Sequence, residues 1–288
     1  MTLDVAAAIA DWRDPDSLAG PGGAEADFYA SRNPPILPRN GPFQTVRELL
    51  MVRGVTPALF KSEPSRPGWD AWLGVHAAAP NLTAGGEERV NLKTADERAL
   101  SAVPGFTPEI ARAIIARRSQ NEFNSLLDLL EVTPAAPANT PGLPTLPGRS
   151  PGQNPSGQRL ISQDLLLDVA DLLSVGDSDQ SAGRININSA PAEVLACLEG
   201  IDLPLAQSLV AHRQSIGGFT HPVALLRAPG FDLDKLRPIL PRITANTDTW
   251  RIRAEGLLPD RDTRARIEVV VRIESSSITT LSYREDAL

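Results

Sequence analysis

The sequence predicts an α+β protein, mainly helical, in which two copies of one helical hairpin unit precede a small antiparallel β-sheet. Two observations support this prediction. A segment that begins at Val90, VNLKTADERALSAVPGFTPEIARAIIARR, recurs without a gap from Ile185 as ININSAPAEVLACLEGIDLPLAQSLVAHR. From Thr249 onward, apolar and polar residues alternate, which is the pattern of β-strands rather than of helices.

These patterns divide the chain into four segments. We expect a helical domain with an acidic loop and the first repeat, a Pro/Gly-rich loop or linker, the second repeat, and an antiparallel β-meander. Their boundaries are 1–132, 133–160, 161–245 and 246–288. The linker contains TPAAPANTPGLPTLPGRSPGQNPSGQ, whose closely spaced prolines predict an exposed, partly extended segment.

Each repeat is expected to form a helix, a tight turn and a second helix. Thr94 precedes the first helical pattern and has Glu97 three residues on, which predicts a capping box, and Ser189 takes the same place in the second copy. A segment led by Phe123 or Phe219 then starts another short helix. Such short helices cannot bury a core alone, so we expect bundles of about four or five helices.

Three further predictions concern single segments. PFQTVRELLMVRG (42–54) matches the second half of the repeat only. ISQDLLLDVADLLSV (161–175) has leucines at helical spacing, so it predicts a helix capped by Ser162 and joined to the second repeat. Cys197 falls in the apolar part of the second copy, and we expect it in the core.

The end of the chain predicts three strands. WRIRAEG and RARIEVVVRIE both alternate, PDRD (259–262) between them is typical of a turn, and LSYRED follows. Three strands are close to the lower limit for a sheet, and the apolar face needs a partner. Because Met1 leads directly into the helix-like VAAAIADW, we expect an upstream segment to supply a helix and further strands.

Composition excludes several classes of protein. The 288 residues carry a formal net charge of −7, the wrong sign for a protein that mainly coats phosphates. The single cysteine excludes an intramolecular disulfide and a cysteine-based zinc site, and three scattered histidines argue against a histidine metal cluster. No stretch approaches the roughly 18 apolar residues that span a bilayer, and the N-terminus has no basic-then-apolar export signal.

An acidic run, DWRDPDSLAGPGGAEADFY, covers residues 11–29. Its carboxylates surround a glycine-rich turn, and calcium, which takes about six to eight oxygen ligands in flexible geometry, requires such a cluster. The candidate calcium ligands are Asp11, Asp14, Asp16, Glu25 and Asp27. A solvated acidic loop is the alternative. A general acid–base pair lacks an accompanying nucleophile, which argues against an enzyme.

The doubled unit resembles the helix-hairpin-helix motif, whose usual function is non-specific DNA binding through backbone N–H groups at a hairpin with two glycines. The first glycine is present as Gly105 and Gly200, but Thr107 and Asp202 replace the second, and Asp232 follows a third turn. An aspartate there caps the helix and repels phosphate. We therefore favour packing or protein contact over DNA binding. The residues of a DNA site would be Gly105, Thr107, Gly200, Arg118 and Arg213.

Four stretches together resemble the general secretion pathway protein K family, the large minor pseudopilins of type II secretion systems. They are DWRDPD…GAEADFY, NPPILPRNGPFQTVRELLMVRGVTP, the pair VNLKTA and ININSAPAEVL, and TDTWRIRAEG. Their order matches as well, over nearly all of residues 5–288.

The resemblance implies a non-enzymatic protein on the periplasmic face of the bacterial inner membrane, with a helical domain inserted into a pilin-like α/β domain. Its partners would be the minor pseudopilins I and J, with which it forms the tip that initiates and caps the pseudopilus, and also the major pseudopilin. Family members bind calcium, which we assign to the carboxylates of the acidic run.

The chain departs from that family in lacking the leader, the apolar N-terminal helix and the first strands, so contact with the membrane would need that helix. The Pro-rich segment resembles an insertion. Two alternatives stay open: a periplasmic DNA receptor of the DNA-uptake type, and a calcium-stabilised adhesion or scaffold module.

Overall fold

The computed structural model describes residues 2–63, 65–134, 159–176, 180–258, 263–274 and 276–287. These separate into two compact units, Met1–Ala77 and Ala78–Leu288. The sequence division places the acidic loop and the first repeat in one segment, whereas the structure separates them at residue 77.

The first unit is made of short helices around a small core of its own. Thr2 caps its first helix by accepting a hydrogen bond from the N–H of Val5. Trp12 and Tyr29 meet edge to face in the core, with ring centroids 4.9 Å apart. Its elements are α1 (Leu3–Arg13), α2 (Ala26–Ala30), the 3-10 helix η1 (Val46–Met51), α3 (Pro57–Phe60) and α4 (Trp69–Trp72).

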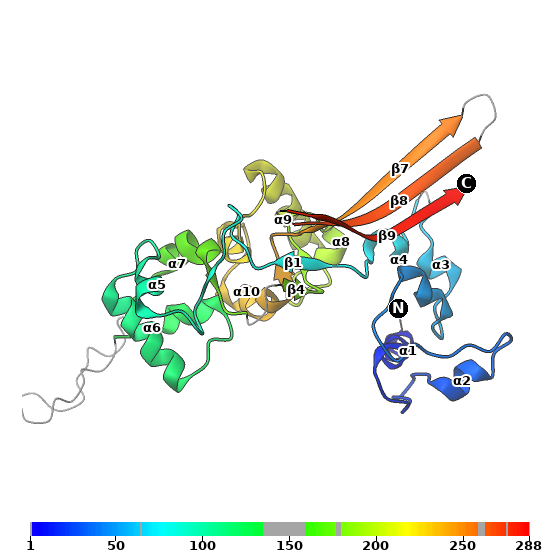
Figure 1. Ribbon diagram of the computed structural model, residues 1–288, viewed down its shortest axis with the longest axis horizontal. Helices are drawn as coiled ribbons and strands as arrows, with labels where there is room; N and C mark the ends of the chain where they lie inside the picture. The colour runs from blue at the N-terminus through cyan, green and yellow to red at the C-terminus, as the bar shows by residue number, and fades with distance from the viewer. Residues whose placement is uncertain are drawn as a thin grey trace, which may run out of the picture. The chain divides into compact units, whose positions relative to one another are not determined.

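The second unit contains two modules with the same order of elements (Figure 1). The first comprises β2 (Val90–Asn91), α5 (Glu97–Ser101), α6 (Pro108–Gln120), η2 (Leu126–Glu131), α7 (Gln163–Val169), η3 (Ala170–Leu172) and β3 (Leu173–Ser174). The second comprises β5 (Ile185–Asn186), α8 (Ala192–Leu195), α9 (Leu203–Ile216), η4 (Pro222–Arg227), α10 (Leu233–Ile239), η5 (Leu240–Arg242) and β6 (Ile243–Thr244). In each module the first strand pairs in parallel with the last, and this pairing closes the module.

The duplication is therefore longer than the sequence repeat. Ser162 caps α7 as expected, because its hydroxyl accepts a hydrogen bond from the N–H of Leu165. The structure places this helix in the first module, however, where it contacts η2 and leads into the strand that pairs with β2. The assignment of 161–175 to the second repeat thus differs from the structure. The segment 42–54 contributes η1, which has the same length as η2 and η4.

Two expected helix caps lie too early in the chain. Asp96 rather than Thr94 caps α5, and Pro191 rather than Ser189 precedes α8. The cause is a turn in which the N–H of Ala95 bonds to the carbonyl of Asn91, because this turn delays the start of the helix. The second copy has the same turn at Asn186.

Both modules share one hydrophobic core. Ion pairs also join them, with Arg237 lying 3.3 Å from Glu131 and Arg227 lying 3.1 Å from Asp168. Cys197 is exposed, so the prediction that it lies in the core is wrong. Leu195, in the single turn of α8, points into the core. Cys197 lies two positions later and therefore points away from the core.

The end of the chain forms the expected three-stranded antiparallel sheet. Its strands are β7 (Thr249–Leu258), β8 (Thr263–Ile273) and β9 (Ile278–Ala287), in the order β7–β8–β9. The expected turn at 259–262 lies outside the described residues. A second small sheet pairs β1 (Ala78–Pro80) with β4 (Gln180–Ala182).

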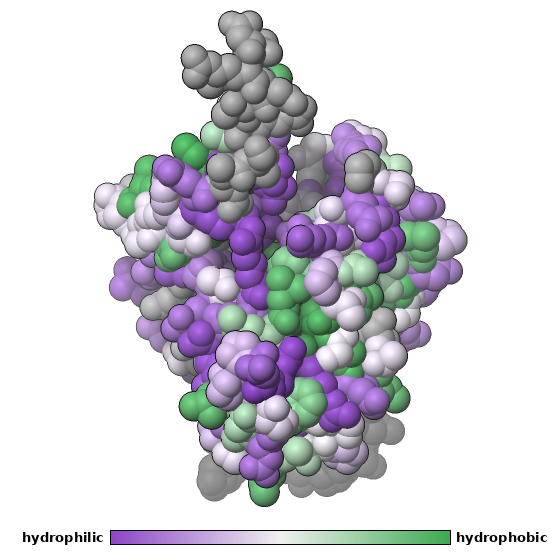
Figure 2. All heavy atoms as spheres, turned by 90° about the vertical axis from the view of Figure 1, so that its right-hand side faces the viewer, coloured by the Kyte–Doolittle hydropathy of each residue, from purple (hydrophilic) through white to green (hydrophobic). Residues whose placement is uncertain are grey.

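The two faces of the sheet differ in chemistry. One face bears cross-strand ion pairs, Arg253 with Glu268 at 2.9 Å and Arg266 with Glu255 at 2.7 Å. On the other face lie Trp250, Ile252 and Ile267, which are 52%, 54% and 39% exposed. Figure 2 shows apolar residues reaching the surface among hydrophilic ones. Within the described chain, this apolar face of the sheet has little cover.

Candidate metal centre and hairpin turns

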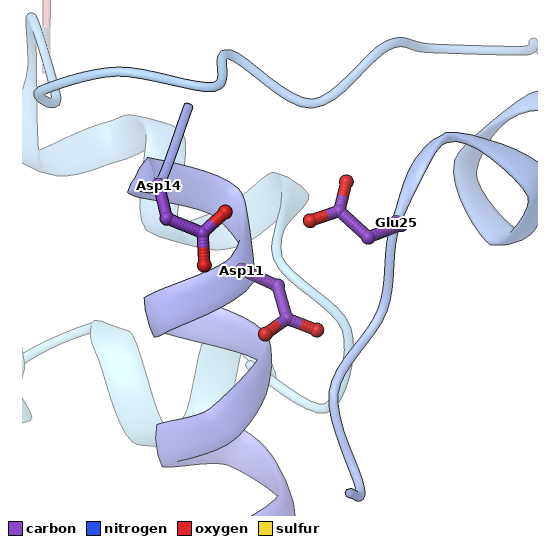
Figure 3. A group of neighbouring side chains, drawn as sticks. All are labelled: Asp11, Asp14 and Glu25. Carbon is purple, nitrogen blue, oxygen red and sulfur yellow. The ribbon is translucent and has the colours of Figure 1, made fainter. Parts of the chain in front are cut away.

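Three carboxylates from two helix ends converge in the first unit. Asp11 lies in the last turn of α1, Asp14 ends that helix, and Glu25 precedes the first residue of α2. One oxygen of each lies within 4.8 Å of the others. Figure 3 shows the side chains of Asp14 and Glu25 pointing toward each other, with Asp11 beside them. We call these residues the acidic triad.

The acidic triad is short of hydrogen-bond donors. Asp11 and Glu25 are only 5% and 6% exposed. One oxygen of Asp14 and both carboxylate oxygens of Glu25 are buried without a hydrogen-bond partner, whereas Asp11 accepts one bond, from the N–H of Gly20 at 3.1 Å. Buried polar atoms are nearly always paired in folded proteins, so these oxygens make the acidic triad a candidate site for a ligand.

The carboxylates repel one another. Burial raises the pKa of Asp14, and the charges of Asp16 and Asp11 raise it further. Burial also raises the pKa of Glu25, with added repulsion from Asp14, Asp11 and Asp16. Asp11 and Asp14 lie at the C-terminal end of α1, where the helix dipole disfavours negative charge.

Two arginines of this unit hold other partners. Arg53 donates to the carbonyl of Gly23 at 2.8 Å and lies over the ring of Phe28. Arg39 binds Glu48 at 2.6 Å. The acidic triad therefore offers three hard oxygen ligands whose charge these arginines leave unneutralised, which is the donor set of calcium or magnesium rather than of zinc or copper.

The structure brings together three of the five candidate ligands. Asp16 lies outside the triad, and one of its carboxylate oxygens accepts the N–H of Leu18 at 2.8 Å. Asp27 is exposed on α2, also outside the triad. Asn40 was not among the predicted residues: it hydrogen-bonds to the carbonyls of Trp12 and Asp16 and has a buried side-chain oxygen without a partner. An asparagine far along the chain gives no local signal of this.

The hairpin turns adopt the conformation that their glycines predict. Gly105 and Gly200 have φ values of 79° and 74°, in the left-handed region. The side chain of Thr107 accepts the N–H of Ile110 at 3.3 Å, and that of Asp202 accepts the N–H of Leu205 at 2.9 Å. Each cap thus occupies one of the N–H groups with which a helix N-terminus would bind phosphate.

The two arginines of the candidate DNA site hold their own modules together. Arg118 donates to the carbonyls of Ala95, at 2.6 Å, and Leu92. Arg213 makes the same contacts in the second module, to the carbonyls of Ala190 and Ile187. Their placement ties the start of each module to its longest helix.

Comparison with protein families gives two matches. Residues 2–62 match the family described as "Type II secretion system (T2SS), protein K". Residues 85–136 and 180–244 match the helix-hairpin-helix motif.

Curated relatives match part of the chain. A protein named "Endonuclease/exonuclease/phosphatase family domain-containing protein 1" is 28% identical over 160 residues in Rattus norvegicus, which is 52% of this chain and 27% of the relative. The protein of that name in Homo sapiens matches with the same identity and the same shares. The chain thus spans about a quarter of the length of these relatives.

Among solved structures, the GspK-GspI-GspJ complex of the enterotoxigenic Escherichia coli type 2 secretion system contains a similar chain. The likeness covers 98% of this chain and 62% of that one, at 10% identity and a TM-score of 0.42. None of the described helices has both the length and the apolar composition to cross a bilayer.

The fold and the motif matches define an α+β protein with tandem helix-hairpin-helix motifs. Its residues 2–62 are similar to the type II secretion system protein K family.

Proposed function

We propose that the chain is a non-enzymatic minor pseudopilin of a type II secretion system. In this role it joins the minor pseudopilins I and J at the tip of the pseudopilus, initiates the fibre and caps it, in contact with the major pseudopilin below. The observation that carries the proposal is the match of residues 2–62 to the protein K family, followed in one chain by the two helical modules and the sheet.

The sheet β7–β9 serves this role as part of a pilin-like domain. Its charged face is satisfied by ion pairs, whereas the face with Trp250 and Ile252 is open. Contiguous apolar surface of this kind marks an interaction site. An apolar helix laid along it would complete the domain and anchor it at the periplasmic face of the inner membrane.

The acidic triad binds calcium in this proposal. Three carboxylates, of which Asp11 and Glu25 are buried, supply the charge, and the unpaired oxygens of Asp14 and Glu25 supply ligand atoms that the protein leaves unused. The ion would tie the C-terminal end of α1 to the start of α2 and so fix the protein K domain.

Co-purification tests the proposed function. The full chain is co-expressed with tagged minor pseudopilins I and J from the same genome, and we expect it to elute with both as one stoichiometric complex. Elution of I and J without the chain would overturn the proposal. A matched mixture in chelator tests whether calcium supports the complex.

A further inference from the structure

Equivalent arginines precede the first strand of each module. Arg89 lies immediately before β2, and Arg184 lies immediately before β5. In the first module Arg89 clamps Asp171 of η3, with its Nε 2.9 Å from the backbone carbonyl and one terminal nitrogen 2.8 Å from the carboxylate. This is a charge-assisted contact in the fork geometry that arginine favours.

The second module has no acid at the matching position. Asp171 stands two residues before Leu173, which pairs with Val90. The residue two before Ile243, which pairs with Ile185, is Pro241. The duplication has therefore kept the arginine and lost its carboxylate.

Arg184 consequently differs from Arg89 in its surroundings. The side chain of Arg89 is 11% exposed and paired, whereas Arg184 is exposed, and no hydrogen bond or ion pair joins its side chain to the described residues. The guanidinium of Arg184 is still partly desolvated, which lowers its pKa, and the nearby charge of Arg89 lowers it further. Two guanidinium groups thus share this region, and the carboxylate of Asp171 faces Arg89.

The nearby histidine adds no negative charge. His221 is buried, and its Nδ1 accepts the N–H of Val223 at 3.1 Å to cap η4. Burial lowers its pKa to about 3, and the charges of Arg89 and Arg184 contribute. The ring is neutral at physiological pH and neither supplies nor replaces the missing carboxylate.

We propose that Arg184 is a docking site for an Asp or Glu carboxylate of a partner protein. The contact would make across an interface the pair that Arg89 and Asp171 make within the chain. The choice of a carboxylate follows from the first module, where the same position of the same fold binds one. The site goes beyond the proposed function, because it names the chemistry by which a partner is held.

The first test restores the lost acid within the chain. Pro241→Asp places a carboxylate where the first module has Asp171, and we expect the melting temperature to rise by about 2 °C at low salt, with the gain lost at about 1 M salt. The gain should also vanish when Arg184→Gln is added. An unchanged or lowered melting temperature for Pro241→Asp at low salt, relative to the wild-type chain, would contradict the equivalence of the two positions.

The second test uses a small probe and the full chain, and does not depend on the pseudopilins. N-acetylaspartate amide is titrated into chain labelled with ¹⁵N-arginine, and the Nε–H signals are followed. We expect a saturable shift of the Arg184 signal, lost in Pro241→Asp, while the exposed Arg242 does not move. No shift at Arg184, an equal shift at Arg242, or a stronger response to inorganic phosphate than to the aspartate probe would overturn the proposal. Failure to bind the pseudopilins would leave this result unaffected.

Discussion

At the scale of single residues, the crowded carboxylates of the acidic triad give the sharpest expectations. Without a cation, Asp14 and Glu25 face each other with unpaired oxygens. Calcium at a hundred times its dissociation constant would add about 2.7 kcal/mol to the free energy of unfolding. We therefore expect chelation to lower the melting temperature of the wild-type chain by several degrees.

The variant Glu25→Gln separates the effect of metal binding from the stability of the metal-free fold. The variant should no longer respond to chelation and, because one of the repelling charges is gone, should be at least as stable in chelator as the wild-type chain. Asp27→Asn, on the exposed side of α2, is the matched control and should keep the full calcium response. Identical melting curves for all three proteins with and without calcium would rule the centre out.

The buried histidine predicts a pH dependence. Because the pKa of His221 falls from 6.5 to about 3 on folding, the folded chain binds fewer protons than the unfolded chain between these values. The penalty is absent above pH 6.5, grows by about 1.4 kcal/mol per pH unit as the pH falls, and levels off near pH 3. His221→Ser copies the cap that Ser125 provides in the first module.

Urea unfolding between pH 7 and pH 4 checks this expectation. The wild-type chain should lose stability more steeply than His221→Ser, and the two should converge toward pH 7 apart from a constant offset. Parallel losses in both proteins would show that the histidine is protonated in the folded state.

At the scale of elements, the hairpin turns offer a matched pair of glycines. A Cβ on Gly105 would lie 2.6 Å from Cδ1 of Leu165, whereas one on Gly200 would meet nothing within 4 Å. Both alanine variants carry the strain of a left-handed residue, about 1 kcal/mol. Gly105→Ala should cost more than Gly200→Ala, because the end of the Leu165 side chain must move. Urea unfolding measures the difference, and equal losses would contradict the packing of α7 over this turn.

How far the sequence predicts the elements depends on the range of their contacts. The cap of α9 at Asp202 and the glycine turns follow from neighbouring residues, and the structure confirms them. The strands β2 and β3 could not be predicted, because two residues have no period and their pairing joins distant positions. The caps of α5 and α8 were misplaced because the turn at Asn91 resembles a helix start in sequence.

The candidate metal centre shows the same limit. Asp11 and Asp14 can be predicted as neighbours from helical spacing, and the acidic composition of the run points to Glu25. The exclusion of Asp16 and Asp27 depends on the path of the loop, which the sequence does not reveal. The prediction of five ligands therefore exceeded the cluster that the fold forms.

At the scale of the whole molecule, the sequence correctly predicts an α+β fold with a terminal sheet. Substitutions on the two faces of that sheet test the role proposed for the chain. Ile252 and Leu257 lie on opposite faces of β7 and are 54% and 56% exposed. Because both side chains are half in solvent, Ile252→Lys and Leu257→Lys should each change the melting temperature by no more than about 2 °C.

The two variants should differ in assembly. Ile252→Lys places a charge on the apolar face and should weaken binding to the minor pseudopilins at least tenfold, whereas Leu257→Lys should bind as the wild-type chain does. Sedimentation of each variant with I and J separates these outcomes. Equal binding by both variants would show that the minor pseudopilins do not contact the apolar face of the sheet.

The central claim is that the chain serves a secretion tip rather than DNA. The most direct measurement is a titration of labelled full chain with a mixture of the minor pseudopilins I and J, and in parallel with duplex DNA, at about 50 mM and about 200 mM salt. We expect saturable binding to the pseudopilins at both salt concentrations and no binding to DNA. Tight DNA binding that is lost at the higher salt, with no binding to I and J, would contradict the claim. It would indicate that the hairpin turns bind DNA phosphates.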